Sequence, residues 1–419
     1  MAKTIRSIGM LVCCVLVLSA AGVGAQDWPQ WRGPNRDGKL TGFTPPKAWP
    51  KELTKKWTVT VGAGVSSPDL VGEELYTFGR IGGEEVTTCL DAASGKVVWQ
   101  DKCPTSAVSG SASGYGGPRS TPSVANGKVY TLGVNGTVSC LDAKSGKVVW
   151  RKDTGEKPLF STSSSPLVAD GKCVVFVGAL TAYDAVSGDV KWTGPKGAPY
   201  GSPVLMTAGG AKQIVTPTAN LLVGVSLADG KELWQAKLPP GNYTISYGTP
   251  IVDGQTVIFG SPSKGGGSSM ALTIDKKGDA FTATELWKSA GSYQYNTPVL
   301  KDGLLFGLSS GKSFFCMDAK TGKVLWTDDT ARGEAGGVLN AGAVILALTG
   351  PAAKGGKGGK GSETATGDSE LVAFEATSAG YKEIAKYKLS QATGLAYPIV
   401  AGNRIYVKGN DALTLWTMD

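Results

Sequence analysis

The sequence of 419 residues contains no histidine. Histidine is the usual general base of Ser/His/Asp and Cys/His relays, the commonest metal ligand and a frequent ligand of haem iron, so these chemistries are excluded. A Cys-x-x-Cys-His haem-attachment motif is excluded for the same reason. An enzyme built on this chain would have to use carboxylate, Lys, Tyr or Cys side chains.

Charged residues are also sparse, at 18% of the chain, whereas Gly (60) and Pro (22) together make up close to a fifth. In a chain that is 41% hydrophobic this composition indicates many tight turns rather than disorder. Lys354, Lys357 and Lys360 lie in a glycine-rich, low-complexity loop at residues 351–369. The loop offers no aromatic platform for bases, so we expect no nucleic-acid partner.

The N-terminal segment resembles a secretory signal. A positively charged start is followed by an apolar run from Ile8 to Leu18 and by the small residues Val23-Gly24-Ala25. The run is shorter than the roughly 20 residues that a bilayer span needs. We therefore expect residues 1–25 to be cleaved, and the chain from Gln26 onward to be periplasmic or otherwise exported to a bacterial cell envelope, with no transmembrane span. No Cys follows the cleavage site, so no lipid-modified N-terminus is expected.

One phrase recurs along the chain, and its first copy is Asp91-Ala-Ala-Ser94-Gly95-Lys96-Val-Val-Trp99. Full copies also run from Asp142 to Trp150, from Asp184 to Trp192 and from Asp318 to Trp326. Degraded copies end at Trp234, at Trp287 and, with Glu375 in the Asp position, at Tyr387. The tryptophans follow one another at intervals of 39 to 53 residues. This is close to the period of propeller blades made of four strands.

Each unit opens with Ser or Thr followed by Pro, and an alternating apolar strand comes next. These openings are Ser67-Pro68, Thr121-Pro122, Ser165-Pro166, Ser202-Pro203, Thr249-Pro250, Thr297-Pro298 and, in looser form, Tyr397-Pro398. In the second unit we expect strands at 121–125, 128–134, 137–141 and 147–152. Asn-Gly pairs separate the first three, as in hairpin turns.

The last unit has only three strands, near residues 397–416. Trp57 lies 42 residues before Trp99, so residues 56–61 should supply the missing outer strand. Closing the ring with both ends removes exposed sheet edges. The sequence therefore predicts an all-β fold, a single eight-bladed β-propeller of four-stranded antiparallel blades over residues 55–419, with residues 26–54 packed on it as a leader.

The repeated phrase has a physical reason. Its Asp can accept hydrogen bonds from amides of its own turn, its Gly can adopt positive φ, and its Trp falls on the outermost strand, where the ring can pack against the next blade. The residues assigned to this tryptophan-docking role are Trp57, Asp91, Gly95, Trp99, Asp142, Gly146, Trp150, Asp184, Gly188, Trp192, Trp234, Trp287, Asp318, Gly322 and Trp326.

The phrase resembles the tryptophan-docking motif of pyrroloquinoline quinone (PQQ) propellers, and the leader stretch from Asp27 to Gly38 resembles the opening of many such proteins. The resemblance covers nearly the whole mature chain and implies the PQQ-like β-propeller repeat family. That family contains quinoprotein dehydrogenases and non-enzymatic propellers such as the outer-membrane assembly factor BamB. The fold alone does not choose between these branches.

The resemblance implies that a dehydrogenase of this family would hold PQQ and Ca²⁺ in a deep site, often under a vicinal disulfide. The only vicinal pair here is Cys13-Cys14, inside the expected signal, and no motif supplies the calcium ligands. These differences favour the non-enzymatic, BamB-like branch, with no catalytic residue, metal or cofactor expected. A PQQ/Ca²⁺-dependent dehydrogenase stays as the alternative. BamB is a lipoprotein and this chain lacks the required Cys, so only the scaffold role is carried over.

Three cysteines, Cys89, Cys140 and Cys316, stand two residues before the motif Asp, where the third copy has Ala182. This position therefore requires a small apolar residue, and a buried free Cys meets that requirement. Cys89 with Cys103 is the one disulfide pair left open.

In a propeller, the loops that join one blade to the next lie on the same face as the loops between the second and third strands of each blade. The long loops at residues 104–119, 261–269 and 351–369 are of these two kinds, so we expect all three on that face. Aromatic and arginine side chains in the inter-blade links are the candidate binding residues. They are Tyr115, Arg119, Phe160, Tyr200, Tyr243, Tyr247, Tyr293, Tyr295 and Arg332. We expect a monomeric scaffold that binds a protein partner in the cell envelope. Two alternatives to a protein partner stay open. The exposed tyrosines could bind a glycan, or the aromatic rings could only fill the central channel or pack on the leader.

Overall fold

The structure is a computed structural model, which describes residues 27–108, 113, 116–156, 158, 160–197, 200–238, 248–261, 267–291, 293, 296–330, 332–333, 336–351, 368–389 and 395–419. Within these ranges the chain forms strands β1 to β32 and no helix. Consequently, no described segment is a helix of the length and apolarity that crossing a membrane requires.

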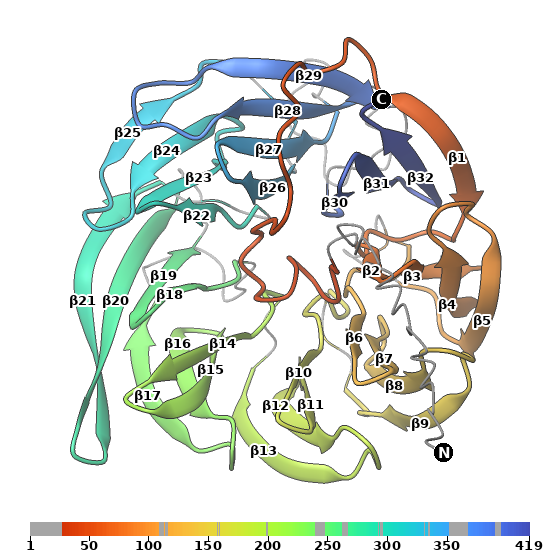
Figure 1. Ribbon diagram of the computed structural model, residues 1–419. Helices are drawn as coiled ribbons and strands as arrows, with labels where there is room; N and C mark the ends of the chain where they lie inside the picture. Colours follow the sequence, from red (N-terminus) through yellow and green to blue (C-terminus); the bar gives the residue numbers. More distant parts are fainter. Residues whose placement is uncertain are drawn as a thin grey trace, which may run out of the picture.

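The strands form eight four-stranded antiparallel sheets around a ring, as predicted (Figure 1). From the innermost strand outward, blade 1 is β2 (Asp69–Val71), β3 (Glu74–Ile81), β4 (Glu84–Asp91) and β5 (Val97–Pro104). Blade 2 is β6 (Ser123–Ala125), β7 (Lys128–Leu132), β8 (Thr137–Asp142) and β9 (Val148–Asp153). Blade 3 is β10 (Leu167–Ala169), β11 (Lys172–Val177), β12 (Ala179–Asp184) and β13 (Val190–Lys196). Blade 4 is β14 (Val204–Ala208), β15 (Ala211–Pro217), β16 (Leu221–Ser226) and β17 (Glu232–Lys237).

The second half of the ring follows the same order. Blade 5 is β18 (Ile251–Asp253), β19 (Thr256–Ser261), β20 (Ser268–Lys277) and β21 (Ala280–Ala290). Blade 6 is β22 (Val299–Lys301), β23 (Leu304–Leu308), β24 (Phe314–Asp318) and β25 (Val324–Thr327). Blade 7 is β26 (Gly336–Ala341), β27 (Val344–Thr349), β28 (Ser369–Glu375) and β29 (Glu383–Leu389). Blade 8 is β30 (Ile399–Ala401), β31 (Arg404–Lys408), β32 (Ala412–Thr417) and, outermost, β1 (Thr54–Thr60).

Blade 8 is the composite blade that the sequence predicts, because β1 pairs antiparallel with β32. Next to this junction lies the side chain of Lys408, which is almost wholly buried. Its ammonium donates to the carbonyls of Gly62 and Gly64, just after β1, at 3.0 and 3.1 Å, and to two carbonyls of its own turn. We call this contact the closure clasp. Burial lowers the pKa of Lys408 to about 8.

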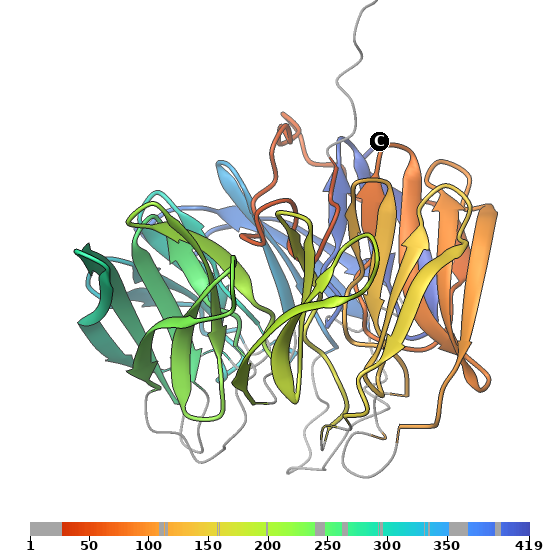
Figure 2. The same ribbon diagram turned by 90° about the horizontal axis from the view of Figure 1, so that it is seen from below.

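The antiparallel order gives the ring two different faces. Turns between first and second strands, and the motif turns between third and fourth strands, lie on what we call the motif-turn face. Inter-blade links and turns between second and third strands lie on the opposite link face. Seen edge-on, the leader (residues 27–53) rises from the motif-turn face, on the side where β32 ends (Figure 2).

Every outermost strand carries a β-bulge. In blade 1, Trp99 pairs with Cys89 but Val97 pairs with Leu90, so that Val98 is the extra residue. The same shift occurs in the other seven blades. In blade 7 the register places Ala385, not Tyr387, at the tryptophan position. A bulge disrupts the ladder and increases the local twist, which makes an edge strand a poorer template for further pairing.

Candidate functional site

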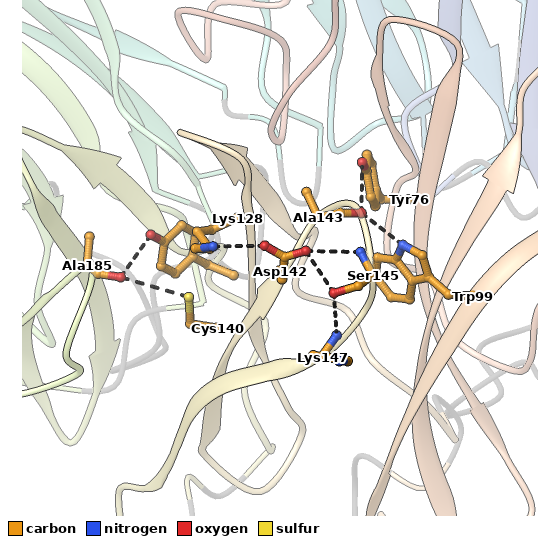
Figure 3. A network of polar contacts seen from close by, with 10 residues as sticks. Tyr76, Trp99, Lys128, Cys140, Asp142, Ala143, Ser145, Lys147 and Ala185 are labelled. Atoms are coloured by element: carbon orange, nitrogen blue, oxygen red, sulfur yellow. Dashed lines mark hydrogen bonds and ion pairs between the residues drawn. The ribbon is translucent and has the colours of Figure 1, made fainter.

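The motif tryptophans dock on the next blade. Trp99 Nε1 donates to the carbonyl of Ala143 at 2.8 Å (Figure 3). Its ring lies over Gly146, where a Cβ would come within 2.5 Å of a ring carbon. The same indole hydrogen bond, at 2.9 to 3.2 Å, links Trp57 to Ala93, Trp150 to Ala185, Trp192 to Leu227, Trp287 to Ala319 and Trp326 to Thr377.

The motif aspartate holds its own turn. Asp142 Oδ1 accepts from the backbone N–H of Ser145 at 3.0 Å and from the Ser145 hydroxyl at 2.8 Å (Figure 3). Hydrogen bonds from Lys128 and Ser145 lower the pKa of Asp142 to about 2. Asp91, Asp184 and Asp318 accept backbone N–H bonds of their own turns in the same way, and the motif glycines Gly95, Gly146, Gly188 and Gly322 have φ between +70° and +75°.

Trp234 differs from the other motif tryptophans. Its Nε1 donates to Oε1 of Gln213, in its own blade, at 2.6 Å. The ring lies over Gly224, which has no room for a Cβ and takes the place of the Cys or Ala that stands opposite the tryptophan in blades 1 to 3. The long hairpin β20–β21 contacts β17 at this junction, and Phe281 packs against the cluster around Trp234. In the sequence, the sign that Trp234 docks differently is the glycine at the position opposite the tryptophan, where the other copies have Cys or Ala.

The repeated Ser/Thr-Pro openings form a hydrogen-bonded belt around the ring centre. The backbone N–H of one opening donates to the hydroxyl of the next, as from Ser67 to Thr121 at 3.1 Å and from Thr121 to Ser165 at 3.0 Å. The series also runs from Ser165 to Ser202, from Ser202 to Thr249 and from Tyr397 to Ser67. We call it the hydroxyl belt. It explains why the inner strands of blades 1 to 5 are preceded by a hydroxyl residue.

The leader crosses the ring centre, which the inner strands surround (Figure 1). Two of its arginines donate there to carbonyls that precede inner strands. Arg32 is only 1% exposed. Its guanidinium donates to the carbonyls of Thr297 and Pro298, the latter at 2.7 Å, and to the hydroxyl of Tyr397 at 3.2 Å. One end of the leader is thereby fixed to blades 6 and 8.

Arg36 reaches the opposite side of the ring and is 4% exposed. Its guanidinium donates to Pro203 O at 2.9 Å, to Ser165 O at 3.3 Å and to Pro166 O. Burial lowers the pKa of Arg36 to about 9, and the charge of Asp69 opposes that shift. Arg36 also donates to the hydroxyl of Ser123 in blade 2 at 3.5 Å, so the two arginines together attach the leader to five blades.

Asp69 is the buried carboxylate of this region. It lies in β2, is 0% exposed, and neither carboxylate oxygen has a hydrogen-bond partner. Burial holds its pKa well above the usual range, although the positive charge of Arg36 acts in the other direction. Sequence reasoning missed Arg32, Arg36 and Asp69, because a leader arginine gives no sign of whether it is solvated or buried.

Three predicted binding residues come together on the link face. The guanidinium of Arg119 donates to Phe160 O, and the Phe160 N–H donates to the hydroxyl of Tyr200 at 3.1 Å. The rings of Phe160 and Tyr200 meet edge to face with centroids 6.0 Å apart. We call these residues the link-face cluster. It connects three successive inter-blade links, and Arg119 and Phe160 stay partly exposed.

Two other predicted binding residues are not accessible. Tyr293 is 3% exposed and its ring packs over Gly260. Arg332 is 4% exposed, lies 2.6 Å from a carboxylate oxygen of Asp328 and stacks over Phe314 at 4.1 Å. The expectation of an exposed side chain is not met at either position, because each fills a contact within the protein. Tyr115, Tyr243, Tyr247 and Tyr295 lie outside the described residues.

The cysteines of the described part are free thiols, so Cys89 and Cys103 are not joined. Cys89, Cys140 and Cys316 each pair across the sheet with a motif tryptophan, which is why their position requires a small side chain. Among the described residues no three His, Cys, Asp or Glu side chains converge in a way that could hold a metal ion.

The family model described as outer membrane protein assembly factor BamB matches residues 82–328 and 277–360. The chain belongs to this family. BamB of Burkholderia pseudomallei (strain K96243) is 26% identical over 299 residues, which cover 68% of this chain and 72% of that protein. BamB of Yersinia pestis is 24% identical over 292 residues, which cover 65% of this chain and 60% of that protein. Quinohemoprotein alcohol dehydrogenase ADH IIB of Pseudomonas putida is 31% identical over 134 residues, but these cover only 28% of this chain and 19% of the enzyme.

Solved structures show the same fold. BamB from Moraxella catarrhalis superposes with a TM-score of 0.62 at 15% identity, covering 87% of this chain and 99% of that one. The quinohemoprotein alcohol dehydrogenase from Comamonas testosteroni superposes with a TM-score of 0.55 at 14% identity, and the match covers 94% of this chain and 80% of that one. The BamB family model begins at residue 82, so the leader arginines lie outside the part of the chain that it matches.

Proposed function

We propose that this member of the BamB family is an exported, non-catalytic scaffold that holds a protein partner in the cell envelope through its link face. The observation that carries the proposal is the family match from β4 of blade 1 to β27 of blade 7, since the matched relatives are named as outer membrane protein assembly factors. A monomer suffices for this role, because the ring is closed by its own two ends.

The link-face cluster supports this surface as the point of contact. Arg119, Phe160 and Tyr200 are fixed to one another across three links, so a partner would meet an ordered surface. Preorganised aromatic and arginine side chains lose little conformational freedom on binding, and they are frequent anchors of interfaces. The Tyr200 side chain is buried, which raises the pKa of its hydroxyl, and it supports Phe160 by accepting the hydrogen bond from the Phe160 N–H.

Site-specific photocross-linking in the envelope tests the proposal. A photoreactive residue replaces Phe160 in one variant and Val186 in a matched control, because Val186 is 74% exposed in a motif turn on the opposite face. We expect a discrete cross-linked protein from position 160 only, and its loss when Arg119→Ala is added. Equal products from both positions, or none from position 160, would overturn the proposal.

The dehydrogenase alternative has its own measurement. Purified protein is titrated with PQQ and Ca²⁺ while absorbance and Tm are followed, since a ligand that binds only the folded state raises Tm. We expect no saturable change, because the relatives matched over most of this chain are named as assembly factors rather than as dehydrogenases. Saturable binding would favour an alcohol or sugar dehydrogenase instead.

A further inference from the structure

The leader contacts the ring as a ligand does rather than as a strand of a blade. It makes isolated bridges, Trp28 to Leu70, Gln30 to Ser123 and Lys39 to Asn340, and joins none of the eight sheets. Its deepest contacts are the hydrogen bonds of two side chains, Arg32 and Arg36. An arginine-bearing segment is thus bound at the ring centre in a turned conformation, which the backbone hydrogen bonds from Gly33 to Gln30, from Arg36 to Gly33 and from Gly38 to Arg32 close.

The ring centre is chemically matched to guanidinium groups. The carbonyls that Arg32 and Arg36 reach belong to the Ser/Thr-Pro openings of blades 3, 4 and 6. The N–H groups of the hydroxyl belt are used between neighbouring blades, and the prolines have none, so these openings present acceptors to the centre. Arginine carries five N–H donors in a rigid planar fork and can bond several carbonyls at once, whereas lysine offers a single compact ammonium.

The bound leader leaves part of the site unsatisfied. Arg32 Nε, Trp28 Nε1 and both oxygens of Asp69 are buried without hydrogen-bond partners. Arg32 and Arg36 have φ of +61° and +58°, in the left-handed region that costs energy for residues other than glycine. Both features lower the net stability of the bound leader. All of these groups belong to the leader except Asp69, which lies in β2.

The leader also has an exposed connection to the rest of the chain. Thr41 and Gly42 are exposed, and a Cβ at Gly42 would meet no atom within 4 Å. The segment approaches from the motif-turn face, opposite the link face (Figure 2). Its release therefore requires no strand to leave a blade.

We propose that the ring centre is a binding site for a turn-forming peptide segment with two arginines four residues apart, which the leader occupies in cis and a segment of the same chemistry from another chain can take over. The site is separate from the link face and independent of the scaffold function. Its ligand class is an arginine-bearing peptide with an aromatic residue beside the first arginine, as in Trp31-Arg32.

The test uses the full chain with a protease recognition sequence inserted at Gly42, so that cleavage leaves the leader bound without a covalent link. The probe is a fluorescent peptide of residues 27–41, and its binding to the cleaved protein is followed by anisotropy. We expect saturable exchange, at least tenfold weaker binding of the R32A and R36A peptides, and unchanged binding of the K39A peptide. Lys39 is the matched control because it is an exposed cation of the same segment.

Three results would overturn the proposal: equal binding of all four peptides, no exchange with excess peptide, or loss of the β-sheet circular dichroism as the leader leaves. A second variant, uncleaved full-length R32A/R36A, should bind the wild-type peptide more tightly than the uncleaved wild-type protein does. Cross-linking from position 160 reports on the link face and distinguishes failure of this site from failure of the scaffold function.

Discussion

The glycine of each docking motif serves both its turn and the preceding blade. Gly146 has φ of +71°, which is ordinary for glycine and strained for other residues. It also lies beneath the ring of Trp99, so that even a methyl group would displace the indole. Gly127, in the hairpin turn between β6 and β7, has φ of +69° but would meet no atom within 4 Å. A comparison of substitutions at the two glycines therefore separates the cost of backbone strain from the cost of lost packing against the indole ring.

We predict that Gly146→Ala lowers the free energy of unfolding by about 3 kcal/mol, through conformational strain and lost indole packing. Gly127→Ala should cost about 1 kcal/mol, because only the strain applies. Urea denaturation of both variants measures the difference. Equal losses would mean that the indole contact adds no stability beyond the turn.

Glu85 is a buried carboxyl between blades 1 and 2. Its Oε1 accepts from the Val134 N–H at 2.7 Å, and its other oxygen lies against Gly133. Burial raises its pKa from 4.5 to about 7, although this hydrogen bond and the charges of Arg80 and Arg151 act in the opposite direction. Between these two pH values the folded protein retains a proton that the unfolded chain has released.

This proton makes stability depend on pH. The contribution of Glu85 is fully present below about pH 4.5 and is lost as the pH rises to about 7, because unfolding then releases the bound proton. Across that window we predict a decrease of about 3 kcal/mol in the unfolding free energy of the wild type relative to Glu85→Gln. Urea denaturation at intervals from pH 4.5 to 8 gives the curve, and parallel profiles for the two proteins would contradict the assignment.

At the scale of elements, the hairpin β20–β21 takes over the role of a docking tryptophan. Trp234 is turned onto its own blade, so the junction between blades 4 and 5 lacks the indole hydrogen bond found at six others. Phe281 and Ala283 from the extended hairpin pack there instead, and Lys276 covers Gly209. The insertion in the fifth copy of the motif is thus a packing element.

We predict that Phe281→Ala destabilises the protein by about 2 kcal/mol, less than a fully buried phenylalanine would because the ring is partly exposed. Thr282→Ala is the matched control, since the adjacent side chain points to solvent and should change stability by less than about 0.5 kcal/mol. Thermal unfolding of the two variants compares them. A small loss for Phe281→Ala would leave the junction without an explanation.

For the whole molecule, the closure clasp decides how firmly the ring is shut. Lys408→Met should leave the carbonyls of Gly62 and Gly64 without their donor and cost about 3 kcal/mol. Lys56→Met removes only an exposed ion pair with Asp419 and should cost less than about 1 kcal/mol. Hydrogen exchange of residues 54–64 measures the effect, and we expect faster exchange in the first variant alone. Unchanged exchange there would show that strand pairing suffices.

The sequence was sufficient to predict the blades of the ring but not the contacts that the leader makes at its centre. A period of 39 to 53 residues, the repeated Asp, Gly and Trp, and Trp57 at the right spacing predict eight blades and the composite one. These features repeat, so each copy supports the others. Arg32, Arg36 and Lys408 occur once, and their partners are backbone carbonyls of blades far away in sequence, which no side-chain pattern reveals.

The composite blade also bears on how the protein reaches its fold. Strand β1 pairs with β32, whose residues are synthesised more than 350 positions later, since Thr54 lies opposite Thr417. Contacts between such distant segments form slowly, because the chain must first lose the entropy of closing a very long loop. Seven blades can assemble in order as the polypeptide emerges, while β1 waits without its partner. During that interval β1 is the strand most open to chaperones, proteases and wrong neighbours.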